Sequence, residues 1–169
     1  MKPDLVAIGK ITKPHGIRGE LKVVSSFDLK EFLAHFSRLW LVRAEQGESF
    51  SVEWVRGRGR SVILKLQDVD DPAAAERFRD WEVAVPRDTL PSLPAGQYYS
   101  FQLVGLMVVT EGGEGVGRIR EVLPMPAHDV YRVRGKRGEV LIPAVKEFVV
   151  EIDLDQGRVV IRSLEGLLE

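Results

Sequence analysis

Short apolar runs separated by polar, glycine-bearing segments recur along this chain, and in some of them apolar and polar residues alternate, which is the pattern of half-buried β-strands. Phe50, Val52 and Trp54, for example, alternate with Ser51 and Glu53, and a period of two places one set of side chains on the buried face of a sheet. Glycine-bearing segments at 45–48 and 56–60 are typical of hairpin turns. The strands predicted in the first half are residues 5–13, 20–25, 38–43, 48–55, 61–66 and 81–85.

Two short helices are predicted between these strands. Asp28 can cap a helix that runs to Phe36, with Glu31 three residues later as its reciprocal partner. Asp71 can cap a second helix whose first position is a proline, and Phe78 can dock that helix on the sheet. Six strands within about 80 residues, with turns at this spacing, favour a small closed β-barrel.

A proline-rich stretch then divides the chain. Pro86, Pro91 and Pro94 lie within nine residues, and such connections are stiff and extended. We predict a first domain at 1–86, a linker at 87–96 and a second domain at 97–169, giving an all-β protein with two small β-barrels. The second half contains strand-like runs at 106–110, 115–122, 129–134, 139–142, 149–154 and 158–162, and an apolar end at 164–169 that is expected to pack on the same domain.

The composition of the chain limits which classes of protein it can belong to. A chain of 169 residues with 44% hydrophobic and 29% charged residues is typical of a globular protein, and no run approaches the roughly 20 apolar residues that span a bilayer. There is no cysteine, so disulfides and thiolate chemistry are excluded, and a cytoplasmic location is expected. A formal net charge of −1, with neither half strongly basic, implies that any RNA contact uses local patches.

No sequence motif of an enzyme stands out. The chain lacks a phosphate-binding P-loop, its glycines 113, 115 and 117 miss the dinucleotide fingerprint, and it has no nucleophile elbow. His15, His35 and His128 are far apart and lack the spacing of metal ligands. We therefore expect no catalytic residues, no metal site and no cofactor.

Basic side chains gather at two predicted turns. Lys13, His15 and Arg18 fall within six residues of a turn built around Pro14, Gly16 and Gly19. A turn needs the glycines and the proline but not the cations, which favour a surface that meets an anion. Arg56, Arg58 and Arg60 form a second cluster. These six residues are the predicted RNA- or ribosome-binding residues, although the second cluster is equally typical of a solvated hairpin tip.

Two adjacent tyrosines, Tyr98 and Tyr99, open the second domain. Neighbouring residues on an extended segment point to opposite faces, so at most one of the pair would enter the core. The other is predicted to anchor a protein partner, since exposed aromatic residues are favoured at interfaces. The alternative is that one tyrosine packs in the core and the other covers the seam between the domains.

Several of these segments resemble the bacterial ribosome maturation factor RimM family. The stretch Gly9–Val23 contains Gly-Lys-Ile followed by Pro-His-Gly-Ile-Arg-Gly-Glu, which matches the N-terminal signature of that family nearly residue for residue. In the second half, Tyr98-Tyr99-Ser100-Phe101-Gln102-Leu103-Val104-Gly105 is similar to the start of its PRC-barrel domain. Segments 127–130, 139–143 and 165–169 are also similar. Pro126, Ala144 and Ser163-Leu164 depart from the family pattern.

The resemblance implies a translation-factor-like β-barrel followed by a PRC-barrel. It implies an assembly factor that binds the immature small (30S) ribosomal subunit at its head, with 16S rRNA and small-subunit ribosomal protein nineteen as partners. The factor would assist rRNA processing as a chaperone, without catalysis, and would be monomeric when free and independent of membranes. Two alternatives stay open: a PRC-barrel adaptor for a non-ribosomal partner, and an enzyme that acts on RNA.

Overall fold

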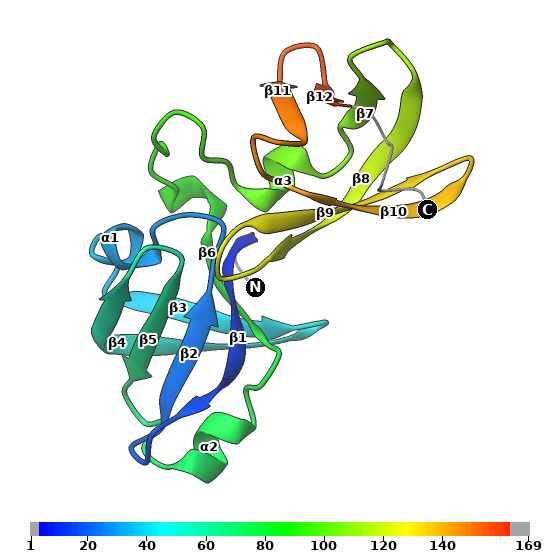
Figure 1. Cartoon of the computed structure of the whole chain (residues 1–169). Helices are drawn as coiled ribbons and strands as arrows, with labels where there is room; N and C mark the ends of the chain where they lie inside the picture. The colour runs from blue at the N-terminus through cyan, green and yellow to red at the C-terminus, as the bar shows by residue number, and fades with distance from the viewer. Residues whose placement is uncertain (1–3, 163–169) are drawn as a thin grey trace. The chain divides into compact units, whose positions relative to one another are not determined.

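The computed structural model describes residues 4–162 of the chain. The chain divides into two compact units, Met1–Gln97 and Tyr98–Glu169, and both consist mainly of β-strands (Figure 1). The expected packing of the apolar end at 164–169 lies outside the described residues. The all-β class predicted from the alternation is confirmed.

The first unit is a closed six-stranded barrel. Its strand order is β1-β2-β5-β4-β3-β6, and β1 pairs with β6 to close it. Every neighbouring pair is antiparallel. All six predicted strands are present: β1 Leu5–His15, β2 Glu20–Val24, β3 Arg38–Arg43, β4 Gln46–Arg58, β5 Ser61–Leu66 and β6 Glu82–Pro86.

Both predicted helices begin at their predicted caps. The Asp28 carboxylate accepts a hydrogen bond from the Glu31 N–H at 3.3 Å and starts α1 (Leu29–Leu33), and Asp71 accepts from the Ala74 N–H at 2.8 Å and starts α2 (Pro72–Glu76). The α1 helix ends at Leu33, short of Phe36, because the chain tightens there into bonds between residues three apart. Phe78, after α2, is buried, with edge-on contacts to Phe50 and Trp81.

The proline-rich stretch is part of the first unit. It begins with the short helix η1 (Arg87–Thr89), and Arg87 binds Asp4 twice, through its backbone N–H at 2.8 Å and through its guanidinium at 2.9 Å. Pro91 and Leu93 line a hollow of about 270 Å³ together with Phe32 of α1. Residues 87–97 therefore pack on the first unit over much of their length.

The second unit is a six-stranded sheet around its own apolar core. The sheet order is β10-β9-β8-β7-β12-β11, and the pairing of β7 with β12 is parallel. Ile119, Val133, Ile142 and Val159 are fully buried at the centre of this core. The elements are α3 Ser100–Leu103, β7 Met107–Thr110, β8 Gly115–Pro124, β9 Asp129–Gly135, β10 Gly138–Pro143, β11 Val149–Asp153 and β12 Arg158–Ile161.

Candidate nucleic-acid interface

The β1–β2 hairpin exposes all three of its predicted RNA-binding side chains. Lys13 and His15 are exposed two residues apart on β1, which places them on one face of the strand. Arg18 is exposed in the turn, and beside it the apolar Ile17 is 79% exposed. The hairpin tip therefore offers two cationic side chains, one imidazole and one apolar side chain to solvent.

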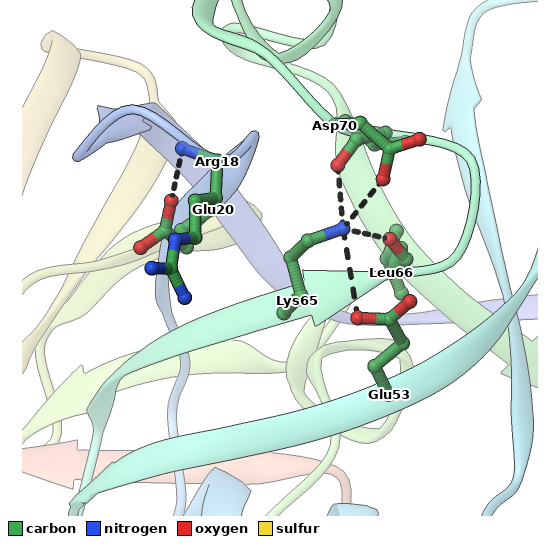
Figure 2. A network of polar contacts seen from close by, with 7 residues as sticks. Arg18, Glu20, Glu53, Lys65, Leu66 and Asp70 are labelled. Atoms are coloured by element: carbon green, nitrogen blue, oxygen red, sulfur yellow. Dashed lines mark hydrogen bonds and ion pairs between the residues drawn. The ribbon is translucent and has the colours of Figure 1, made fainter.

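Hydrogen bonds within the turn fix the backbone that carries Arg18. The Arg18 N–H donates to the Glu20 carboxylate at 2.7 Å (Figure 2). Partial burial opposes ionisation of Glu20, but the backbone N–H groups of Arg18 and Glu20 and the charges of His15 and Arg18 outweigh it and lower its pKa. Gly16 and Gly19 have φ values of +69° and +85°, a region that side chains disfavour. This bonding uses the Arg18 backbone and leaves its guanidinium exposed.

Gly19 also marks a close approach between the hairpin and the loop after β5. A Cβ at Gly19 would overlap the carbonyl of Val69. That carbonyl accepts a hydrogen bond from the Lys65 side-chain nitrogen at 2.7 Å, and the same nitrogen donates to Leu66 O at 2.6 Å and to the Asp70 carboxylate at 3.1 Å (Figure 2).

Lys65 is therefore a structural cation. Its side chain is 7% exposed, and the Glu53 carboxylate lies 3.7 Å from its nitrogen, opposite Asp70. Two carboxylates and two carbonyls saturate this nitrogen, so Lys65 supports the loop that meets Gly19 and does not contribute to the exposed cationic surface. Sequence pattern did not identify it, because its partners are loop groups that only the tertiary structure brings together.

The second predicted cluster lies at the other end of the barrel. His15 pairs with Glu20 at the start of β2, whereas Val24 at its end pairs with Ser61, next to Arg60. The two ends of β2 are about 13 Å apart. Figure 1 accordingly shows the β1–β2 turn near α2 and the β4–β5 turn near α1. The six predicted RNA-binding residues thus form two separate surfaces.

Members of the second cluster differ in exposure. Arg56 and Arg58 are exposed on β4, and the Arg56 guanidinium lies 4.1 Å from the centre of the Trp54 ring. Arg60 is partly buried, and its guanidinium donates to Ser26 O at 3.5 Å. Arg56 and Arg58 are available to a ligand, while Arg60 holds the turn to the segment after β2.

The two tyrosines also differ from each other. Tyr99 is 5% exposed and stacks on Phe101 with ring centres 5.7 Å apart, and burial raises the pKa of its hydroxyl. Tyr98 is partly buried and packs against the core of the second unit. The Tyr99 N–H donates to the Gln102 side chain at 2.8 Å, because α3 starts directly after it. Of the two, Tyr98 has more surface for a partner.

No group of three His, Cys, Asp or Glu side chains within residues 4–162 is placed to hold a metal ion. No helix in that range is long and apolar enough to cross a membrane.

The chain is a two-domain β-protein. Its first domain is a closed antiparallel barrel with an exposed basic hairpin, and its second domain is a separate β-sheet. Residues 6–90 match the RimM N-terminal domain, and residues 100–167 match the RimM PRC barrel domain. The chain therefore belongs to the RimM family of ribosome maturation factors, as its signature segments predicted, and it has a role in ribosome maturation.

Similar proteins cover almost the whole chain. Ribosome maturation factor RimM of Symbiobacterium thermophilum is 39% identical over 99% of this chain and 97% of that protein. The RimM of Pseudomonas paraeruginosa is 42% identical over 91% of each. Among solved structures, a RimM protein from Pseudomonas aeruginosa is 35% identical, covers 95% of this chain and 98% of its own, and has a TM-score of 0.48.

Proposed function

We propose that this protein binds the immature small (30S) ribosomal subunit at its head and assists maturation of 16S rRNA there without catalysing a covalent step. Its partners in this proposal are 16S rRNA and ribosomal protein nineteen of the small subunit, and it acts in the cytoplasm as a monomer. The observation that carries the RNA contact is the β1–β2 hairpin, whose backbone is fixed while Lys13, His15 and Arg18 stay exposed.

Differential binding is the mechanism that suits such a surface. A factor that binds the immature head more tightly than the mature one shifts the population toward the conformation it prefers, and it leaves when assembly removes that conformation. Because the Arg18 N–H is bound to Glu20 in the free protein, the turn backbone needs little ordering on binding, and the entropy cost falls mainly on the exposed Lys13 and Arg18 side chains. Phosphate contacts position the protein on RNA without reading its sequence.

Sedimentation of cell extract tests the proposal. The full chain is expected to travel with free small subunits and not with joined ribosomes. The variant Lys13→Gln/Arg18→Gln should weaken binding to purified immature subunits and lower the slope of log affinity against log salt by about 1.4 to 1.8, since each lost phosphate contact removes about 0.7 to 0.9. A chain absent from the small-subunit fractions would contradict the proposal.

The control for this variant removes the same charge elsewhere on the barrel. Lys30 and Arg43 are exposed and lie outside both basic turns, so Lys30→Gln/Arg43→Gln should leave the salt slope unchanged. Equal effects of the two pairs would mean that net charge, and not the β1–β2 hairpin, determines binding.

A further inference from the structure

A basic groove lies on the second unit, and none of the predicted RNA- or partner-binding residues lines it. It has a volume of about 610 Å³ and lies between the β7–β8 turn and the β9–β10 turn. Five basic side chains line it: Arg118, Arg120, Arg134, Lys136 and Arg137. Arg118 and Arg120 lie on β8 and Arg134 on β9, both labelled in Figure 1, and the other two lie in the turn after β9.

Two glycines allow the strands that carry these cations to approach each other closely. A Cβ at Gly117 of β8 would overlap the carbonyl of Arg134, and a Cβ at Gly135 of β9 would overlap the carbonyl of Val116. Gly117 also has a φ of +151°. Next to this contact, Arg118 and Arg134 are directly paired across the two strands. The backbone therefore brings cations from two strands to one small area.

Carboxylates do not neutralise the cations of this groove: Glu139 is paired with Arg134 across β9 and β10, but its carboxylate lies 3.5 Å from Arg132. Its one acidic lining residue, Glu114, lies 3.3 Å from the Arg137 guanidinium. Within residues 4–162, Arg120, Arg134 and Lys136 have no carboxylate at ion-pair distance, and Arg118 uses a single N–H to bind Gly105 O at 2.9 Å. Arg132, outside the groove, contrasts with them because it lies 3.0 Å from Glu121 and 3.5 Å from Glu139.

Pairing of two arginines across these strands lowers the free energy of unfolding of the free protein. Like charges that face each other across a strand pair are destabilising, and Arg118 and Arg134 are such a pair. A ligand with negative charge would remove that cost. Guanidinium groups bind phosphate through two parallel hydrogen bonds, which makes arginine the preferred residue for this contact.

We propose that this groove binds phosphates of an RNA backbone, as a second RNA contact in addition to the β1–β2 hairpin. The identification of that RNA as ribosomal rests on the proposed function. Among the described residues that line the groove none is aromatic, so it lacks both the stacking platforms that read bases and the aromatic anchors of protein interfaces. Cations over a floor of glycine and small aliphatic groups suit contact with backbone phosphates.

Binding of the full chain to a 16S rRNA transcript, measured over a range of salt concentrations, tests the groove. Arg120→Gln/Arg134→Gln should lower the slope of log affinity against log salt by about 1.4 to 1.8, the loss of two phosphate contacts. The matched control, Lys146→Gln/Arg162→Gln, removes the same charge from exposed positions outside the groove and should leave the slope as in the wild type. If the first variant unfolds, Arg120→Gln/Lys136→Gln takes its place, since both side chains are exposed.

The outcomes separate this inference from the proposed function. An unchanged slope in the groove variant, or the same change in the control, would overturn the RNA site even if the wild type travels with small subunits. A groove variant that binds the transcript normally but loses small-subunit binding would assign the groove to a protein partner and would also overturn it. A groove-dependent slope in a chain that never travels with small subunits would support the RNA site and contradict the proposed function.

Discussion

At the scale of single residues, Lys65 supports the loop against which the basic hairpin packs. We expect Lys65→Met to lower the free energy of unfolding by about 3 kcal/mol, because it leaves the carbonyls of Leu66 and Val69 without their donor and two carboxylates without their cation. Urea unfolding measures this. Lys10→Met, at an exposed position on β1, is the control and should change stability by less than about 0.5 kcal/mol. Equal effects of the two variants would contradict the structural role of Lys65.

The tyrosine pair allows a second test at this scale. Tyr99→Ala should cost about 3 kcal/mol or more of stability because its ring is buried. Tyr98→Leu keeps apolar packing in the core but removes the ring and hydroxyl, so it should melt near the wild type. It should weaken small-subunit binding about thirtyfold, or about 2 kcal/mol, if Tyr98 is a partner anchor. Melting temperature and binding are measured on both variants, and the anchor is ruled out if Tyr98→Leu binds normally or if its loss of binding follows a comparable loss of folding.

At the scale of elements, the barrel separates two hairpin turns that have similar clusters of basic residues in the sequence. The β1–β2 turn and the β4–β5 turn lie at opposite ends of β2, and sites more than about 10 Å apart usually act additively. If both contact RNA, the losses in log affinity caused by Lys13→Gln/Arg18→Gln and by Arg56→Gln/Arg58→Gln should sum in the fourfold variant. If the β4–β5 turn is only a solvated tip, Arg56→Gln/Arg58→Gln should have no effect on its own. Filter binding to a 16S rRNA transcript distinguishes these cases.

The same scale shows which elements sequence pattern can predict. Short apolar runs bounded by turn residues located the strands, with alternation at 48–55, and the two helices followed from the capping chemistry of Asp28 and Asp71. The helix α3 has four residues, about one turn, so it leaves no repeating apolar pattern in the sequence. Parallel pairing of β7 with β12 and the groove between two hairpin turns depend on contacts distant in sequence. A local sequence pattern cannot predict contacts between distant strands, so only the structure shows that the basic residues of the groove lie together.

At the scale of the whole molecule, charge is organised locally. The net charge is −1, yet exposed cations gather at two turns of the first unit and in the groove of the second. A uniformly basic protein would bind any RNA through its overall field. If these separate basic surfaces contact RNA as proposed, strong binding needs several phosphates in contact at once, and we expect the shape of the RNA to decide which state of the subunit is bound.

If the protein recognises RNA shape as proposed, we expect it to discriminate between immature and mature small subunits. Affinity for immature small subunits should exceed that for mature ones by at least about tenfold, or about 1.4 kcal/mol, because only differential affinity can shift the population. Equilibrium binding of the full chain to both subunit preparations at one salt concentration measures this ratio.

In the same mixtures the purified protein should leave precursor 16S rRNA intact with Mg²⁺, ATP or GTP present. Equal affinity for the two states would contradict the binding mechanism, and precursor cleavage abolished by one point substitution would establish an enzyme in its place.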